Sequence, residues 1–205
     1  MSYLKMCSVA MAAAAVAVAL AAAPASATVL CKSALMSTCS VEDRLSVGTA
    51  INSDLKGEFA TIEGIGTSFV VHCGESTLDA AVTNPGPATM ASAATEAFSF
   101  GSCSTSAAPA VLKNGALEFN WTSGNNATIT AQGVEITVIY LATLDCVYGE
   151  NLPSLEAGSL IGGAPAVVKL NLTLATIKGS GCPGTMRWEA EYKVTSPNPL
   201  YVTAS

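Results

Sequence analysis

The chain has 205 residues, of which 50% are hydrophobic and 12% are charged, and its formal net charge is −6 at pH 7. A chain of this length can form one domain around a single hydrophobic core. The acidic surplus makes nucleic acid and anionic membrane surfaces poor partners, because both carry negative charge.

Residues 1–27 have the pattern of a cleavable secretory signal. Lys5 gives a positive start, an apolar run from Val9 to Ala23 follows, and Ala25-Ser26-Ala27 is a small-x-small cleavage site. The apolar run is shorter than the roughly 20 residues that cross a bilayer as a helix. We therefore expect cleavage between Ala27 and Thr28, no transmembrane segment in the mature chain, and a secreted protein.

Residues 28–205 are predicted to form one domain. They contain no linker, no change of composition and no repeat at a fixed period. We expect residues 28–46, with the short loop between Cys31 and Cys39, to form an irregular N-terminal arm that is stapled onto the first strand.

The cysteines indicate a disulfide framework. Once Cys7 leaves with the signal, an even number remains, as is typical of exported proteins with disulfides. Metal binding is the alternative, but no two of these cysteines have Cys-x-x-Cys spacing and only one histidine could join them. Many pairings are open; we favour sequential ones, since each then brackets a local group of strands. The preferred pairs are Cys31 with Cys39, Cys73 with Cys103, and Cys146 with Cys182.

Alternating apolar and polar residues predict half-buried strands. The clearest case places Trp188, Ala190, Tyr192 and Val194 on one face, with charged residues between them. Residues 116–121 and 168–174 alternate in the same way. The alanine-rich segment 88–97 is predicted to be a strand of small residues.

The spacing of the strands predicts the fold class. Turn signals such as Asn84-Pro85-Gly86-Pro87 and Lys113-Asn114-Gly115 recur at short intervals between the strands. Cys73 and Cys146 share the parity of their apolar neighbours, so both thiols should face the core, where a bridge between two sheets would lie. We predict an all-β, antiparallel β-sandwich, immunoglobulin-like or related, that is cross-linked by disulfides.

A set of motifs in a fixed order resembles a known group of exported proteins. The motifs are Cys31-Lys32-Ser33-Ala34, Gly48 to Ile51, Val71-His72-Cys73, Phe98 to Cys103, Asp145 to Gly149, Gly181-Cys182-Pro183 and Tyr192 to Pro197. Together they resemble an uncharacterised family of secreted, cysteine-containing all-β proteins of high-GC Gram-positive bacteria, across nearly the whole mature chain. The resemblance implies a secreted all-β domain with the same cysteine ladder. It implies no activity, so no functional residue is carried over.

The residues offer little for catalysis. His72 is the single histidine and lies on the outward parity of its strand, as expected of a surface residue beside a disulfide. A serine nucleophile elbow needs Gly-x-Ser-x-Gly before a helix, which the chain lacks. A glycosidase needs two carboxylates converging across a cleft, whereas Glu189 and Glu191 fit solubilising charges. We expect no enzymatic activity.

We also expect no cofactor. Calcium would require several oxygen ligands in one loop, and Glu42-Asp43 is the single adjacent acidic pair. Trp121 and Trp188 could stack on a sugar, but their apolar parity favours packing in the core.

The function expected from the sequence is that of a secreted or envelope-associated, non-catalytic structural or interaction protein. The partner is unknown; a cell-envelope component and a small ligand both remain open. The first alternative is a small-molecule or carbohydrate carrier, which would show a deep apolar pocket between the sheets. The second is a hydrolase, which would need paired carboxylates in a cleft or a perturbed pKa at His72. Extracellular location, with or without attachment to the cell wall, fits all three.

Overall fold

The structure is a computed structural model that describes residues 27–33, 38–105, 109–150 and 153–205. Residues 1–26 of the predicted signal, which spans residues 1–27, lie outside the described residues. Within them the chain is all-β, with one short 3-10 turn, η1 (Val41–Asp43). The strands are β1 (Thr28–Cys31), β2 (Ala50–Leu55), β3 (Ala60–Gly64), β4 (Val70–Asn84), β5 (Ala91–Cys103), β6 (Ala110–Lys113), β7 (Ala116–Ser123), β8 (Asn126–Gln132), β9 (Glu135–Tyr140), β10 (Leu144–Gly149), β11 (Leu155–Ile161), β12 (Val167–Lys178), β13 (Thr185–Ser196) and β14 (Tyr201–Ala204).

The alternation in the sequence correctly located several strands. In β13, Trp188, Ala190, Tyr192 and Val194 are all buried while the residues between them are at least partly exposed. The patterns over residues 116–121 and 168–174 fall within β7 and β12. Residues 91–97 of the alanine-rich segment form the first half of β5, which confirms a strand there, whereas residues 88–90 precede the strand.

Every strand pair is antiparallel, and the strands of the large sheet pair in a closed circuit. The pairing runs through β4, β5, β7, β8, β11, β12 and β13. It returns from β13 to β4 through β2 and β3. Each of these two short strands pairs with β13 and with β4, at different stretches of the two long strands.

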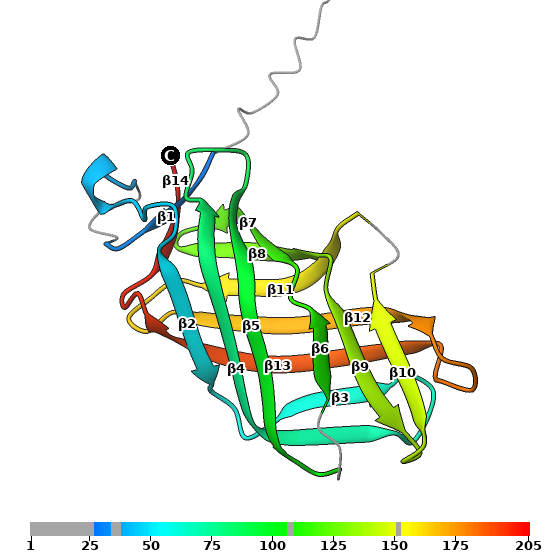
Figure 1. The fold of residues 1–205 in the computed structure, drawn as a ribbon. Helices are drawn as coiled ribbons and strands as arrows, with labels where there is room; N and C mark the ends of the chain where they lie inside the picture. The colour runs from blue at the N-terminus through cyan, green and yellow to red at the C-terminus, as the bar shows by residue number, and fades with distance from the viewer. Residues whose placement is uncertain (1–26, 34–37, 106–108, 151–152) are drawn as a thin grey trace, which may run out of the picture.

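The circuit is flattened into two layers that enclose the core. In Figure 1, β2, β4 and β5 cross in front of β11, β12 and β13. The predicted all-β, antiparallel and disulfide-linked class is confirmed. The two separate sheets of an immunoglobulin-like sandwich are not, because one sheet supplies both layers.

The large sheet divides at one end. One edge of β12 has two partners. Residues 167–170 pair with β11, and residues 175–178 pair with β10. Beyond β10, the sheet continues through β9 to β6. The chain therefore bends where β6 leads to β7, β8 to β9 and β10 to β11, and these three bends define the region that we call the corner.

Aromatic side chains fill the space between the layers. Trp188 is 0% exposed, and Phe98 and Phe100 meet its ring edge-on at centroid distances of 4.9 and 5.2 Å. The Tyr192 hydroxyl lies 2.8 Å from the Ser76 hydroxyl oxygen, and burial raises the pKa of Tyr192. Edge-to-face contacts of this kind add stability beyond the burial of apolar area.

The three disulfides join the cysteine pairs that sequential pairing favours. Cys73 and Cys146 are both 0% exposed, as their parity predicted. The expected bridge between two sheets is wrong for Cys73, which lies directly opposite Cys103 on the neighbouring strand. Cys182 lies in the turn between β12 and β13 and anchors β10 to it.

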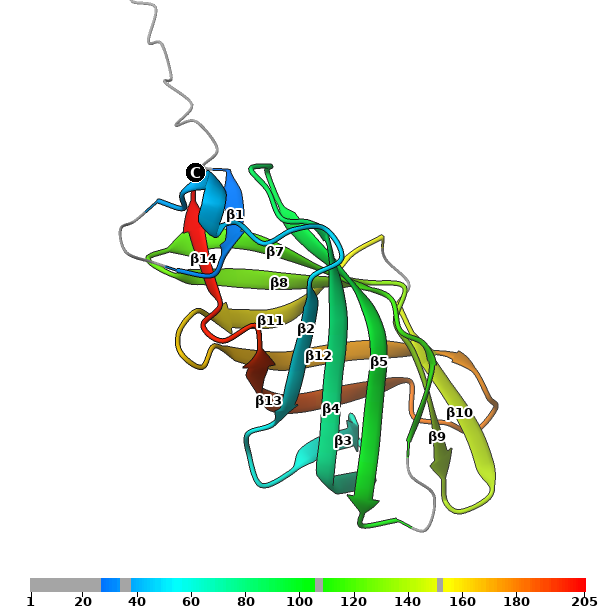
Figure 2. The same cartoon turned by 60° about the vertical axis from the view of Figure 1, so that its left-hand side comes forward.

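The two ends of the described chain form a small sheet of their own. The predicted arm over residues 28–46 begins with β1, which is a regular strand paired with β14 at the C-terminus. Figure 2 shows this pair beside the ends of β7 and β8. Val29, Leu30 and Val202 are fully buried there, so the arm contributes to the packed interior.

Within the described residues, no helix has the length and apolar character needed to cross a membrane.

Candidate binding sites

The structure separates the residues that the sequence singled out. Trp188 packs in the core, whereas Trp121 is only partly buried and its indole N–H donates to the Gly124 carbonyl at 2.9 Å. His72 is exposed, with its Nδ1 3.2 Å from the Thr61 hydroxyl oxygen. Glu189 lies on the outer face of β13 with 44% of its side chain exposed.

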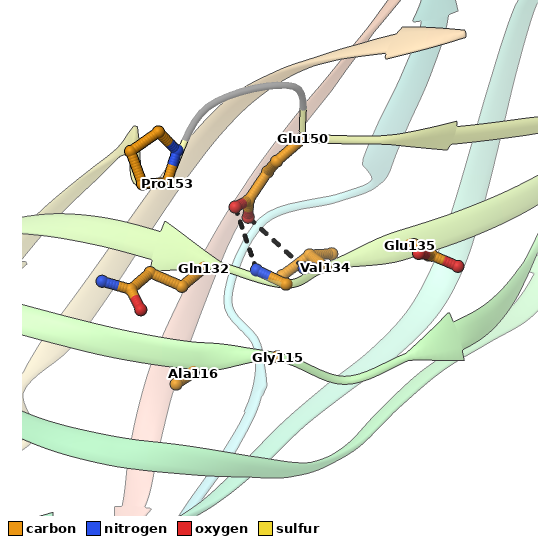
Figure 3. Close-up of a pocket in the computed structure, with 8 residues that line it drawn as sticks. Gly115, Ala116, Gln132, Val134, Glu135, Glu150 and Pro153 are labelled. Atoms are coloured by element: carbon orange, nitrogen blue, oxygen red, sulfur yellow. Dashed lines mark hydrogen bonds between the residues drawn. The ribbon is translucent and has the colours of Figure 1, made fainter. Parts of the chain in front are cut away.

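A hollow of about 450 Å³ lies at the corner. Its lining comes from the bends between the strands and includes Gly115, Gln132, Glu135, Glu150 and Pro153. Figure 3 shows the carboxylate of Glu150 directed at the bend between β8 and β9. There the backbone N–H groups of Gly133 and Val134 donate to it at 2.9 and 3.3 Å.

Burial raises the pKa of Glu150, and the two backbone donors offset part of this effect. A carboxylate that accepts two backbone N–H groups holds a bend in the way that a capping side chain holds the end of a helix. The geometry therefore assigns Glu150 a structural role, in which β10 is tied to the bend that leads from β8 into β9.

The other polar groups of the corner also have partners in the chain. Lys113 forms an ion pair with Glu135 across β6 and β9. The side-chain amide of Gln132 donates to Glu118 at 2.9 Å. With Glu150 occupied by backbone, these groups hold the corner together and offer few free contacts to a ligand.

A second pair of hollows lies on the outer face of the layer that contains β11, β12 and β13. One, of about 390 Å³, is lined by Gly57, Phe59, Thr61, Lys169, Leu170, Asn171, Glu189, Ala190 and Glu191. The other, of about 490 Å³, is lined by Thr128, Glu156, Gly158, Ser159 and Asn171. Asn171 lines both, so the two hollows adjoin, and together we call them the outer trough.

Strand register places the polar residues of the outer trough in two rows. In the first row, Thr128, Ser159, Lys169 and Glu191 are cross-strand neighbours on β8, β11, β12 and β13. The neighbouring row places Asn171 beside Glu189, then Thr61 and His72, on β12, β13, β3 and β4. Residues far apart in the chain thus form one face, because side chains directly opposite on adjacent strands lie close together.

Glycine helps to form the hollow at one end. A Cβ added to Gly158, whose φ is +139°, would lie 1.9 Å from the backbone oxygen of Lys169. Gly158 therefore lets β11 approach β12 where no side chain would fit. The pairing of β11 with β8 shifts register at this point, between Glu156 and Gly158, as in a β-bulge.

Several polar side chains of the outer trough are free. Within the part of the chain that the structure describes, the side chains of Glu156, Ser159 and Asn171 form no hydrogen bond or ion pair. At the far end Phe59 is 46% exposed, and its ring lies 5.4 Å from that of His72. The trough thus combines free donors and acceptors with one accessible aromatic ring.

Glu191 is the most strongly paired carboxylate of the outer trough. Lys169 contacts it at 2.9 Å and Lys56 at 3.4 Å. The hydrogen bond from Lys169 is the largest cause that lowers the pKa of Glu191. Glu191 is therefore poorly suited to act as a general acid, which requires a raised pKa.

No group of three His, Cys, Asp or Glu side chains that could hold a metal ion occurs among the described residues. Asp43, half of the adjacent acidic pair, has its pKa lowered by hydrogen bonds with Ser33 and Ser40. The Ser40 hydroxyl lies 2.9 Å from the Asp43 carboxylate and caps η1.

Sequence motifs do not reveal the residues at the centre of the outer trough. Asn171 was visible as a polar position in the alternating pattern of β12, but nothing in that pattern distinguished it from other exposed positions. Phe59 and Gly158 gain their roles from neighbours on other strands. Their positions follow from pairing between distant segments, which short motifs do not encode.

Comparisons with known proteins found no matching family model, no matching curated protein and no matching solved structure.

Proposed function

We propose that this protein is a secreted or envelope-associated, non-catalytic interaction protein whose rigid disulfide-linked sheet presents the outer trough to a partner. The observation that carries the proposal is the set of free polar side chains, centred on Asn171, around two adjoining hollows on regular strands. Binding groups held on strands are more precisely placed than groups on loops.

The three disulfides support a place of action outside the cytoplasm, because such bonds persist in oxidising compartments. The pattern of a secretory signal in residues 1–27 and the resemblance to secreted proteins of high-GC Gram-positive bacteria agree with this location.

Two further observations favour binding over the alternatives. Trp188, Phe98 and Phe100 occupy the space between the layers where a carrier would hold an apolar ligand. A glycosidase needs one carboxyl group with a raised pKa beside a second carboxylate. Burial raises the pKa of Glu150, but two backbone N–H groups engage that carboxylate, and Glu135, which lines the same hollow, is paired with Lys113.

The test is cosedimentation of the purified mature protein with cell envelopes of the organism that makes it. We expect saturable binding by the native protein. Protein that has been reduced and alkylated serves as the control and should remain in the supernatant, because opening the loops closed by disulfides destabilises the fold. Native protein that stays in the supernatant would contradict a role at the envelope.

The location has its own test in the intact mass of the protein isolated from the secreting cell. We expect a chain that begins at Thr28 and whose six remaining cysteines react with an alkylating reagent only after reduction. Cysteines that react without reduction would contradict an oxidising compartment.

A further inference from the structure

We propose that the outer trough binds an oligosaccharide that is neutral or carries amino groups. This inference rests on the proposed function, since it names the partner of the same surface. It is drawn from the lining of the trough, its length, its charge and its position within the sheet.

The lining matches the chemistry of a sugar. A sugar ring presents hydroxyl groups at its edge and apolar C–H groups on its faces. The free side chains of Asn171, Ser159 and Glu156 supply both hydrogen-bond donors and acceptors. Phe59, whose ring lies 5.4 Å from that of His72, supplies an accessible ring for an apolar face.

The dimensions of the outer trough favour a chain of sugars over a single one. The trough crosses β8, β11, β12, β13 and β3, which are neighbours in the sheet. At a strand spacing of about 4.8 Å, this path is roughly 20 Å long. Its two hollows meet at Asn171, which would contact the middle of the bound chain.

Charge restricts the class of oligosaccharide. Three carboxylates line the outer trough, but Glu191 is paired with Lys169 and Lys56 and Glu189 with Arg187, so among the described residues of the lining Glu156 alone carries an unpaired charge. A polymer of uronic acids or phosphates would be repelled by this surface. A neutral chain would not, and an amino sugar would gain from the free carboxylate of Glu156.

The position of the outer trough disfavours an extended peptide. Peptides that extend a sheet pair with a free strand edge through their backbone. Here β12 and β13 both have hydrogen-bonded neighbours on each side. A ligand must therefore be recognised by outward side chains, and these are mostly polar.

The experiment measures binding of three hexasaccharides to the mature protein by isothermal titration calorimetry: a neutral glucose hexamer, a cationic glucosamine hexamer and an anionic galacturonic acid hexamer. We expect the neutral hexamer, the cationic hexamer or both to bind and the anionic one not to bind. The variants Asn171→Ala and Phe59→Ala should each weaken binding about fivefold to tenfold, as expected for loss of one good contact.

The matched control is Asn126→Ala, which removes another exposed asparagine side chain, at the start of β8 and outside the lining of the outer trough. It should bind as the unaltered protein does. The proposal would be overturned if only the anionic hexamer bound. It would also be overturned if the unaltered protein and all three variants bound equally well.

Envelope binding separates failure of this inference from failure of the proposed function. Should the native protein sediment with envelopes while no hexamer binds and Asn171→Ala sediments normally, the oligosaccharide site is wrong and the interaction role stands. Should the native protein bind neither envelopes nor any hexamer, both are wrong.

Discussion

The corner and the outer trough use polar side chains in opposite ways. At the corner, Glu150 accepts two backbone N–H groups, and Glu135 is paired with Lys113. On the outer trough, Asn171 and Glu156 have no partner among the described residues, although the strands that carry them are well paired. Similar residue types therefore stabilise the fold in one place and remain available in the other.

The two regions also shift carboxyl pKa values in opposite directions. Burial raises the pKa of Glu150, whereas a hydrogen bond from Lys169 lowers that of Glu191. The cause is position in the sheet. Glu150 lies at a bend where the chain itself removes water, and Glu191 lies on an outward row that solvent reaches. A hollow alone does not mark a binding site; the state of its polar groups distinguishes the two.

The largest expected loss of stability comes from a change in the core beneath the outer trough. Trp188 lies on β13 between Arg187 and Glu189, with its side chain on the inner face. Trp188→Ala should lower the free energy of unfolding by about 3–5 kcal/mol, because it leaves a large cavity. Denaturant unfolding followed by circular dichroism measures this loss.

Trp121→Ala is the matched control for Trp188→Ala. Its side chain is only partly buried, and its indole N–H donates to the Gly124 carbonyl in the turn between β7 and β8. We expect a clearly smaller loss of stability. Equal losses for the two variants would contradict the assignment of Trp188 to the core and Trp121 to its margin.

A smaller effect is expected at the corner, where Glu150 should make the stability of the protein depend on pH. A raised pKa in the folded state means that the protonated form of Glu150 is favoured on folding. Its contribution to stability is therefore fully present below the unfolded pKa, near 4.5, and is lost as pH rises through the folded pKa. Glu150→Gln should flatten the stability profile over the pH range that begins near 4.5 and extends above it.

The measurement is the denaturation midpoint of the unaltered protein and of Glu150→Gln across that pH range. Glu135→Gln, on a neighbouring strand of the same corner, is the control and should leave the Glu150-dependent slope in place. A Glu150→Gln profile as steep as that of the unaltered protein would show that this carboxyl group is not desolvated.

Part of the fold could be predicted from the sequence, and part could not. Local alternation located β12 and β13, and the parity of Cys73 and Cys146 placed both thiols in the core. The closed circuit was beyond prediction, because it depends on pairing between segments as distant as β2 and β13. An open sandwich and a closed circuit have the same alternation along each strand, so the pattern cannot distinguish them.

The candidate site was harder to predict than the fold for a related reason. Outward positions such as Asn171 are polar in any sheet with one wet face, so their identity carries little signal. Their arrangement emerges only when register brings Thr61, Asn171 and Ser159 onto neighbouring strands. Glu150 was missed because its role depends on the bend between β8 and β9, which contains its hydrogen-bond donors.

The smallest expected effect concerns the ion pairs of the outer trough. A lowered folded pKa means that Glu191 contributes stability above its unfolded pKa, near 4.5, and loses that contribution as pH falls through the folded pKa. The contribution is on the order of 0.5 kcal/mol, since the pair is exposed. Lys169→Ala should therefore raise the pKa of Glu191, as measured by NMR titration of its side-chain carboxyl carbon.

Lys56→Ala offers the graded control, because its ammonium lies 3.4 Å from Glu191 and that of Lys169 lies at 2.9 Å. We expect a smaller rise in the pKa of Glu191 from Lys56→Ala than from Lys169→Ala, and both rises should shrink as salt screens the charges. A larger effect from Lys56 would contradict this order. It would mean that Lys56, and not Lys169, is the main partner of Glu191 in solution.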